Sequence, residues 1–150
     1  FRFDSYYAFG SIVALFHDIA ITFSFLIFLQ YEISISIIAA LLTILGYSLN
    51  DTIVIYDRIR ENISLNIEKL DHDIVANKSL NTTLNRTVIT SLTTLLVAVV
   101  LFILGGPILQ PFAMALIIGV LTGTYSSLFV ATPIMLILEE KYKLEDFEEE

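Results

Sequence analysis

The chain has 150 residues, of which 56% are hydrophobic and only 16% are charged, and its mean hydropathy is +0.80. Soluble domains carry about 25% charged residues, so this composition argues against an ordinary soluble domain and equally against a disordered or collagen-like chain. The net charge of −8 comes largely from acidic residues near the C-terminus, which indicates a solvated tail and no nucleic-acid partner. Because there is no cysteine, disulfides and thiolate metal sites are excluded.

Four segments are long and apolar enough to cross a membrane. A spanning helix needs about 20 mostly apolar residues, because the hydrocarbon core is about 30 Å thick. The predicted spans are residues 8–29, 35–56, 87–104 and 112–138, the last long enough to tilt or to bend at Pro133. The apolar runs continue almost to the end, which argues against a signal peptide. We therefore expect an all-α, polytopic membrane helix bundle with four transmembrane helices, forming a single domain over residues 1–150.

The positions of lysine and arginine predict the orientation of these spans. Short cytoplasmic loops hold such residues in excess. All eight fall on one side of the predicted membrane, and they are Arg2, Arg58, Arg60, Lys69, Lys78, Arg86, Lys141 and Lys143. We therefore expect a cytoplasmic loop at 57–86, an acidic cytoplasmic tail at 139–150, and both ends of the sequence in the cytoplasm. The chain begins at Phe1 with no initiator methionine, so we also expect a fragment of a longer protein.

The predicted cytoplasmic loop has a helical pattern of its own. Ile63, Ile67, Leu70 and Ile74 recur at i, i+4, i+7 and i+11, which is typical of an amphipathic helix. Such a helix would lie along the membrane face or pack on another subunit, and the sequence leaves both possibilities open.

Asp51 is the most informative residue of the second span. An ionisable side chain inside a membrane costs a few kcal/mol and therefore needs a partner or a function. Asp51 lies six residues before Asp57, about 9 Å further into the membrane. It could take up and release a proton, or it could form a static ion pair with Arg86 at the inner mouth of the third span. Arg86 taken alone fits a positive residue that extends its charge to the membrane surface.

The first span carries the adjacent pair His17 and Asp18. Neighbouring residues point about 100° apart on a helix, so both cannot face one partner. Asp18 has Ala14 and Thr22 one turn away on either side, which predicts that all three face the bundle. We expect a structural hydrogen bond from His17, and Asp18 is a further candidate for handling the same proton.

Two spans carry rows of small or hydroxyl side chains. The third span has the hydroxyl row Thr87, Thr90, Ser91 and Thr94, which could hydrate a helix interface or only tie helices together. The fourth has a small residue at every fourth position, namely Ala115, Gly119, Gly123, Ser127 and Ala131. Such a ridge lets another helix approach closely, so it predicts helix packing.

A longer motif links the chain to a known family. Residues 46–54 read GYSLNDTIV, and residues 57–62 read DRIREN. They resemble the signature of the SecF family, the smaller membrane subunits of bacterial SecDF protein-export complexes. The positions that carry it are Gly46, Asn50, Asp57, Arg58, Arg60, Glu61 and Asn62. Further similarities, at His17-Asp18, between Ser79 and Leu95 and at Gly105-Gly106-Pro107, follow in the same order.

The resemblance implies a member of the resistance-nodulation-division (RND) superfamily, whose six-helix units associate in pairs. The chain resembles the third to sixth spans of such a unit, in the bacterial inner membrane. The resemblance implies export of proteins driven by the proton-motive force, with Asp51 and Arg86 as the proton relay. It also implies four kinds of partner: SecD, the SecYEG translocon, YajC and the exported preproteins.

Other functions remain to be weighed against this interpretation. The sequence offers no serine–histidine dyad in a suitable context, no metal cluster and no phosphate-binding glycine loop, so we expect no enzyme, no cofactor and no metal. One alternative is an RND-type exporter of lipids or small hydrophobic compounds. The other is a structural membrane scaffold, in which the pair of Asp51 and Arg86 locks helices together.

Overall fold

The structure, a computed structural model, describes residues 5–65 and 71–148, with residue 5 and residues 142–148 described by their backbone alone. The described chain is helical except for short connections at residues 29–34, 65, 71 and 105. Its elements are α1 (Ser5–Phe28), α2 (Ile35–Ser64), α3 (His72–Leu104), α4 (Gly106–Ser126), the π-helical turn η1 (Ser127–Ala131) and α5 (Thr132–Glu148). Four helical segments are long and apolar enough to span a membrane: Tyr6–Phe28, Ile35–Ser64, His72–Leu104 and Gly106–Lys141. The predicted all-α fold with four spans is confirmed.

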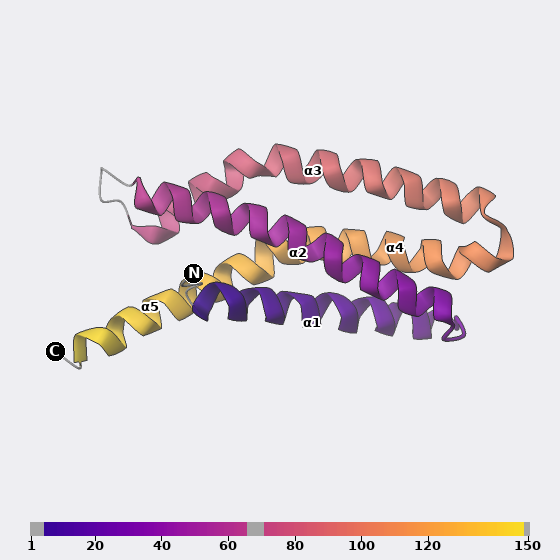
Figure 1. The fold of residues 1–150 in the computed structure, drawn as a ribbon, viewed down its shortest axis with the longest axis horizontal. Coiled ribbons are helices and arrows are strands. Elements are labelled where there is room, and N and C mark those ends of the chain that lie inside the picture. Colours follow the sequence, from indigo (N-terminus) through magenta and orange to yellow (C-terminus); the bar gives the residue numbers. More distant parts are fainter. Residues whose placement is uncertain (1–4, 66–70, 149–150) are drawn as a thin grey trace.

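The helices form an elongated bundle in which α2 and α4 lie between α1 and α3 (Figure 1). α2 and α4 each contact all three of the other long helices, so they form the centre of the bundle. The start of α1, the end of α2, the start of α3 and the whole of α5 lie at one end, on the left of Figure 1. The turns that join α1 to α2 and α3 to α4 lie at the other end. α2 and α4 therefore run parallel, and both enter the bundle from that second end.

α2 and α3 are longer than the predicted spans. They contain 30 and 33 residues, or about 45 and 50 Å of helix, whereas a hydrocarbon core is about 30 Å thick. Much of the predicted loop at 57–86 is therefore an antiparallel extension of these two helices. The prediction of one amphipathic helix from Ile63 to Ile74 is wrong, because Ile63 belongs to α2 and Ile74 to α3. Ile67 and Leu70 lie outside the described residues.

Local chemistry explains where the helices begin and end. The Ser34 side chain accepts a hydrogen bond from the backbone N–H of Ile37 at 3.4 Å, which caps the start of α2. Between α3 and α4 the chain turns at Gly105 and Gly106, and Gly106 has a φ of 71°, a conformation that favours glycine. Pro107 follows in the first turn of α4, where a missing N–H is tolerated.

The ridge of small residues on the fourth span lies against neighbouring helices. All five of its members are buried. A Cβ atom on Gly119 would collide with the side chain of Ile44 on α2. A Cβ atom on Gly123 would lie 3.4 Å from Cβ of Ser48 and 3.6 Å from the Asp18 carboxylate. Glycine at position 119 therefore allows α4 to approach α2 closely, whereas a Cβ at position 123 would make ordinary van der Waals contacts.

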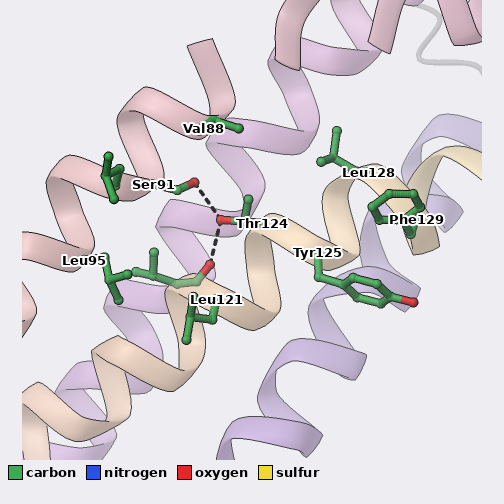
Figure 2. Close-up of a pocket in the computed structure, with 10 residues that line it drawn as sticks. Val88, Ser91, Leu95, Leu121, Thr124, Tyr125, Leu128 and Phe129 are labelled. Atoms are coloured by element: carbon green, nitrogen blue, oxygen red, sulfur yellow. Dashed lines mark hydrogen bonds between the residues drawn. The ribbon is translucent and has the colours of Figure 1, made fainter. Parts of the chain in front are cut away.

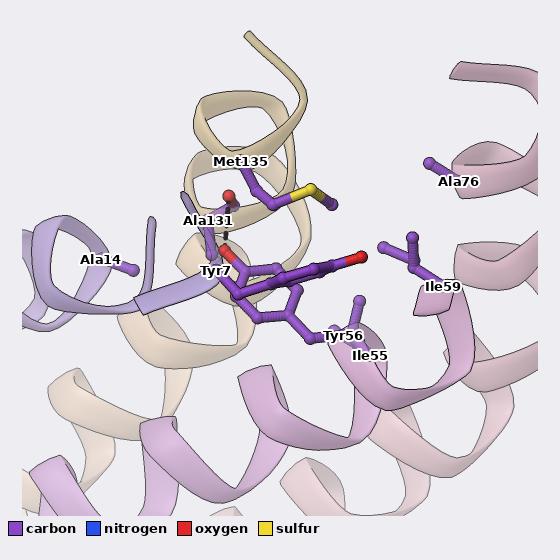
Figure 3. Packing of buried hydrophobic residues seen from close by; sticks show 8 residues of the cluster. All are labelled: Tyr7, Ala14, Ile55, Tyr56, Ile59, Ala76, Ala131 and Met135. Carbon is purple, nitrogen blue, oxygen red and sulfur yellow. Dashed lines mark hydrogen bonds between the residues drawn. The ribbon is translucent and has the colours of Figure 1, made fainter. Parts of the chain in front are cut away.

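A hydrophobic cluster holds the helices together at the end of the bundle where α5 lies (Figure 3). It draws on α1, α2, α3, η1 and α5, and its buried members are Tyr7, Ala14, Ile55, Tyr56, Ile59, Ala76, Ala131 and Met135. The rings of Tyr7 and Tyr56 meet edge to face, with their centroids 5.2 Å apart. The cluster anchors α5 and η1 to α2 near the membrane boundary.

Candidate functional site

Asp51 lies inside the bundle, where α2 meets α3 and the fourth span. Its side chain accepts two hydrogen bonds, from Thr87 Oγ1 to Oδ1 at 3.1 Å and from Ser127 Oγ to Oδ2 at 3.0 Å. Only 7% of Asp51 is exposed, and Thr87 and Ser127 are fully buried. The predicted candidate is therefore held by two neutral hydroxyl groups from two different helical segments.

Arg86 lies near Asp51 but does not pair with it. Its positive charge acts on Asp51 electrostatically, yet these two described side chains form neither an ion pair nor a hydrogen bond. Arg86 is exposed and lines a groove of about 220 Å³ between α2 and α3, together with Asp57, Glu61 and Thr83. The static ion pair between Asp51 and Arg86 is absent from this structure, because the contact from α3 to Asp51 is made by Thr87 instead.

Asp18 is a second buried carboxylate, and none of its surface is exposed. It accepts a hydrogen bond from Ser48 Oγ on α2 at 2.5 Å, and its Oδ1 lies 3.2 Å from Nδ1 of His17. Ala14 and Thr22 are buried on the same side of α1, as the sequence predicts. Among the described side chains, Asp18 has no hydrogen bond to Asp51 or Arg86, and its partner Ser48 lies three residues before Asp51 on α2.

The hydroxyl row of α3 bonds partly within its own helix and partly across the bundle. Thr90 and Thr94 donate to backbone carbonyls one turn earlier. Thr87 donates to Asp51, and Ser91 accepts a hydrogen bond from Tyr47 at 3.0 Å and lies 2.6 Å from the hydroxyl of Thr124. Figure 2 shows this contact between Ser91 and Thr124, which line a groove of about 350 Å³ together with aliphatic and aromatic side chains. The row ties α3 to α2 and α4.

The signature residues occupy two different environments. Gly46 and Asn50 are exposed on α2, and nothing lies within 4 Å of a Cβ placed on Gly46. Asn62 donates to Ser79 Oγ on α3 at 2.8 Å, which ties the extended ends of α2 and α3 together. Arg58 donates to Glu61 at 2.6 Å on the surface, and Asp57 and Arg60 are polar surface residues of the same segment.

The sequence did not predict several hydrogen-bonding residues of the interior. Ser48 and Tyr56 are hydrogen-bonding residues of the interior, and Ser127 was expected only to pack helices. Glu139 was assigned to the solvated tail, but it is 6% exposed, and its Oε1 lies 2.5 Å from Nδ1 of His72. Ser48 and Tyr56 lie on the same face of α2 as Asp51 and Ile55. This spacing was the available signal that their side chains point into the interior. Among the described residues, no cluster of three histidine or carboxylate side chains could hold a metal ion.

Known proteins are similar to this chain in sequence and in fold. Residues 1–141 match the C-terminal family of the protein export membrane proteins SecD and SecF. Protein translocase subunit SecF of Koribacter versatilis is 50% identical over 140 residues, which cover 93% of this chain and 34% of that protein. Protein translocase subunit SecF of Rhodothermus marinus is 51% identical over 146 residues, which cover 93% of this chain and 47% of that protein.

A solved structure matches as well. The crystal structure of SecDF, a translocon-associated membrane protein, from Thermus thermophilus has a TM-score of 0.87 and 48% sequence identity. The match covers 93% of this chain and 19% of that chain. The present chain therefore spans less than half the length of each of these relatives.

Proposed function

The chain belongs to the SecD/SecF family of protein export membrane proteins, as its signature predicts, and we propose that it works in a translocase driven by the proton-motive force. The family is one of multi-pass membrane transport proteins. In this proposal the four helices carry a proton relay, and the movement that the relay produces promotes export of preproteins across the bacterial inner membrane.

The environment of Asp51 supports the proposal most strongly. Hydroxyl groups donate to a carboxylate and accept from a carboxylic acid, so a charged Asp51 can accept from both Thr87 and Ser127, and a neutral Asp51 can donate its single hydrogen to Thr87. A buried ion pair with an arginine would instead favour the charged form of the carboxylate. Because these contacts come from neutral partners, the geometry favours a carboxylate that gains and loses a proton over a static lock between helices.

The groove beside Arg86 offers this proton a way to water. Thr83 lines the groove, and Thr87, one turn further along the same face of α3, binds Asp51. The volume of about 220 Å³ has room for several water molecules. We place Arg86 in the relay as the positive charge that lines this groove. Asp18 has a lesser part, since its hydrogen-bond partner on α2 is Ser48, and the hydroxyls that bind Asp51 are those of Thr87 and Ser127.

An exposed face of α2 supports SecD as the partner. Gly46, Asn50 and Ile53 are exposed along one stripe of this membrane helix. Asn50 has no hydrogen bond to any residue that the structure describes, and an unpaired amide in hydrocarbon costs several kcal/mol. A second helical unit that bonds to Asn50 would remove this cost, and Gly46 would let its helix approach closely.

The remaining partners and the orientation complete the proposal. The excess of lysine and arginine at the end where α2 stops and α3 begins supports a cytoplasmic location for that end. SecYEG, YajC and the exported preproteins are proposed partners of the whole protein. One proton that crosses about 100 mV releases about 2.3 kcal/mol, which could drive a conformational cycle.

The test is export of a secreted precursor in cells whose full-length subunit carries Asp51→Asn. Asparagine keeps the size of the side chain but cannot be ionised, so we expect normal membrane levels, normal association with SecD and failed export. Asp73→Asn, an exposed residue in the first turn of α3, is the matched control and should export normally.

Each other outcome supports an alternative. Lost assembly of the Asp51→Asn complex would favour the structural scaffold, in which Asp51 holds helices together. Normal assembly with normal export would contradict the relay. If export depends on the sodium gradient and not on the proton gradient, the coupling ion is sodium. Loss of lipid or small-molecule export alone would favour an RND-type exporter of lipids or small hydrophobic compounds.

A further inference from the structure

The fourth span changes its helical geometry close to Asp51. The π-helical turn η1 separates α4 from α5, and Pro133 follows it by two residues. Proline has no N–H, and its ring crowds the carbonyl four residues earlier, which here belongs to Phe129 within η1. A π turn is wider than an α turn and is often found at functional sites. The sequence therefore explains why the helix widens at this point.

Side chains hold the widened turn in place. Thr132 Oγ1 donates to the carbonyl of Ser127 at 3.2 Å, and Tyr56 Oη donates to the carbonyl of Ala131 at 2.7 Å, a bond visible in Figure 3. A Cβ on Gly10 would collide with the Tyr56 hydroxyl, so glycine at this position of α1 leaves room for that bond. Tyr56 of α2 thus holds the last residue of η1, Ala131, while the first residue of η1, Ser127, contacts Asp51.

Ser127 has two possible acceptors for its single hydroxyl hydrogen. Its Oγ lies 3.0 Å from Oδ2 of Asp51 and 3.1 Å from the carbonyl oxygen of Thr124 in its own helix. A serine hydroxyl donates only one hydrogen bond at a time. Thr87, in contrast, has Asp51 as the acceptor of its one side-chain hydrogen bond within the described chain.

We infer that Ser127 is a positioning residue that transmits the charge of Asp51 to the fourth span. This inference rests on the proposed function of Asp51. When Asp51 is charged, Ser127 donates to it, because hydrogen bonds to charged acceptors are the stronger ones. When Asp51 is neutral, the Ser127 hydrogen turns to the Thr124 carbonyl. One proton on Asp51 thereby decides whether Ser127, the first residue of η1, is bonded to Asp51, while the bond from Tyr56 to Ala131 holds the last residue of η1 to α2 in both states.

The neighbouring serine provides a matched control. Ser126 is as fully buried as Ser127, but its hydroxyl donates only to the carbonyl of Gly123 in its own helix, at 3.2 Å. Ser126→Ala and Ser127→Ala therefore delete the same atom from adjacent buried positions. Only the second removes a contact with Asp51.

The experiment compares these variants in the full-length subunit, assembled with its partner in inverted membrane vesicles. The readouts are assembly, the rate of export and the pH profile of export. In Ser127→Ala we expect normal assembly, export reduced by about tenfold, and a profile displaced by about one pH unit towards alkaline pH, since charged Asp51 loses one donor. Ser127→Thr should restore both, and Ser126→Ala should resemble the unmodified protein.

The charged groups near Asp51 are Arg86 on α3 and, beyond Ser48, Asp18 on α1 with His17 beside it, and all three are unchanged in these variants. A pH profile of Ser127→Ala that coincides with that of Ser126→Ala would refute the inference. If Ser127→Ala does not assemble, Ser127→Cys keeps the shape with a weaker donor and must show the same displacement. If Asp51→Asn exports normally, the proposed function fails and this inference fails with it.

Discussion

Gly119→Ala should weaken the contact between α4 and α2. The added Cβ would collide with Cδ1 and Cγ1 of Ile44 and would lie 2.9 Å from its Cγ2. Ile44 is fully buried and cannot swing into open space, so the two helices must move apart. Overpacking of this kind costs about 1–3 kcal/mol, and the better helix propensity of alanine returns up to about 1 kcal/mol. We expect a net loss of about 1–2 kcal/mol in the free energy of unfolding.

The assay is unfolding of the purified full-length subunit in mixed micelles by increasing amounts of a denaturing detergent. Gly46→Ala is the matched control, because it makes the same change on a membrane helix where nothing lies within 4 Å of the new atom. Its free energy of unfolding should be unchanged or up to about 1 kcal/mol higher.

A second substitution tests the physical cause. Ile44→Ala removes all three atoms that the new Cβ would meet, so Gly119→Ala should cost less in that background. The double-mutant cycle should give a favourable coupling of about 1–2 kcal/mol. A Gly119→Ala protein as stable as the unmodified one, or a coupling energy near zero, would refute this account of how α4 sits on α2.

Two further predictions follow from single hydrogen-bonding groups. Asn50→Leu should leave the membrane level of the subunit unchanged but reduce its copurification with SecD, because a partner that bonds to the amide loses its bond; retained copurification would place SecD on another face. Tyr56→Phe should lower the free energy of unfolding by about 1 kcal/mol, since it deletes the bond to the Ala131 carbonyl and keeps the ring. An unchanged midpoint in the same detergent titration would show that this bond does not stabilise η1.

Hydropathy was sufficient to predict the number of spans and the helical fold. It could not predict how far α2 and α3 continue beyond the membrane, because a polar helix such as the first half of α3 has no apolar run to mark it. The pattern through Ile63 and Ile74 was misleading, since residues that match one helical period belong to two helices here.

The site was predicted in part. Asp51 and Asp18 stood out because carboxylates are rare inside membranes, and both are buried. The hydroxyls that bind Asp51 were less conspicuous, because serine and threonine are common in membrane helices and usually bond within their own helix. Ser127 also fitted a row of small residues. Its contact with Asp51 joins residues 76 positions apart on different helices, which spacing along one helix cannot predict.

The extensions of α2 and α3 make a lever of the bundle. From Asp51 to Ser64 there are 13 residues, or about 20 Å of continuous helix. A tilt of about 10° at the level of Asp51 would move the end of α2 by roughly 3 Å, which is comparable to the size of a methyl group. The bond between Asn62 and Ser79 makes α3 follow. A change confined to the Asp51 carboxylate and one buried hydroxyl, that of Ser127, would then reach the aqueous surface as a movement large enough for another protein to detect.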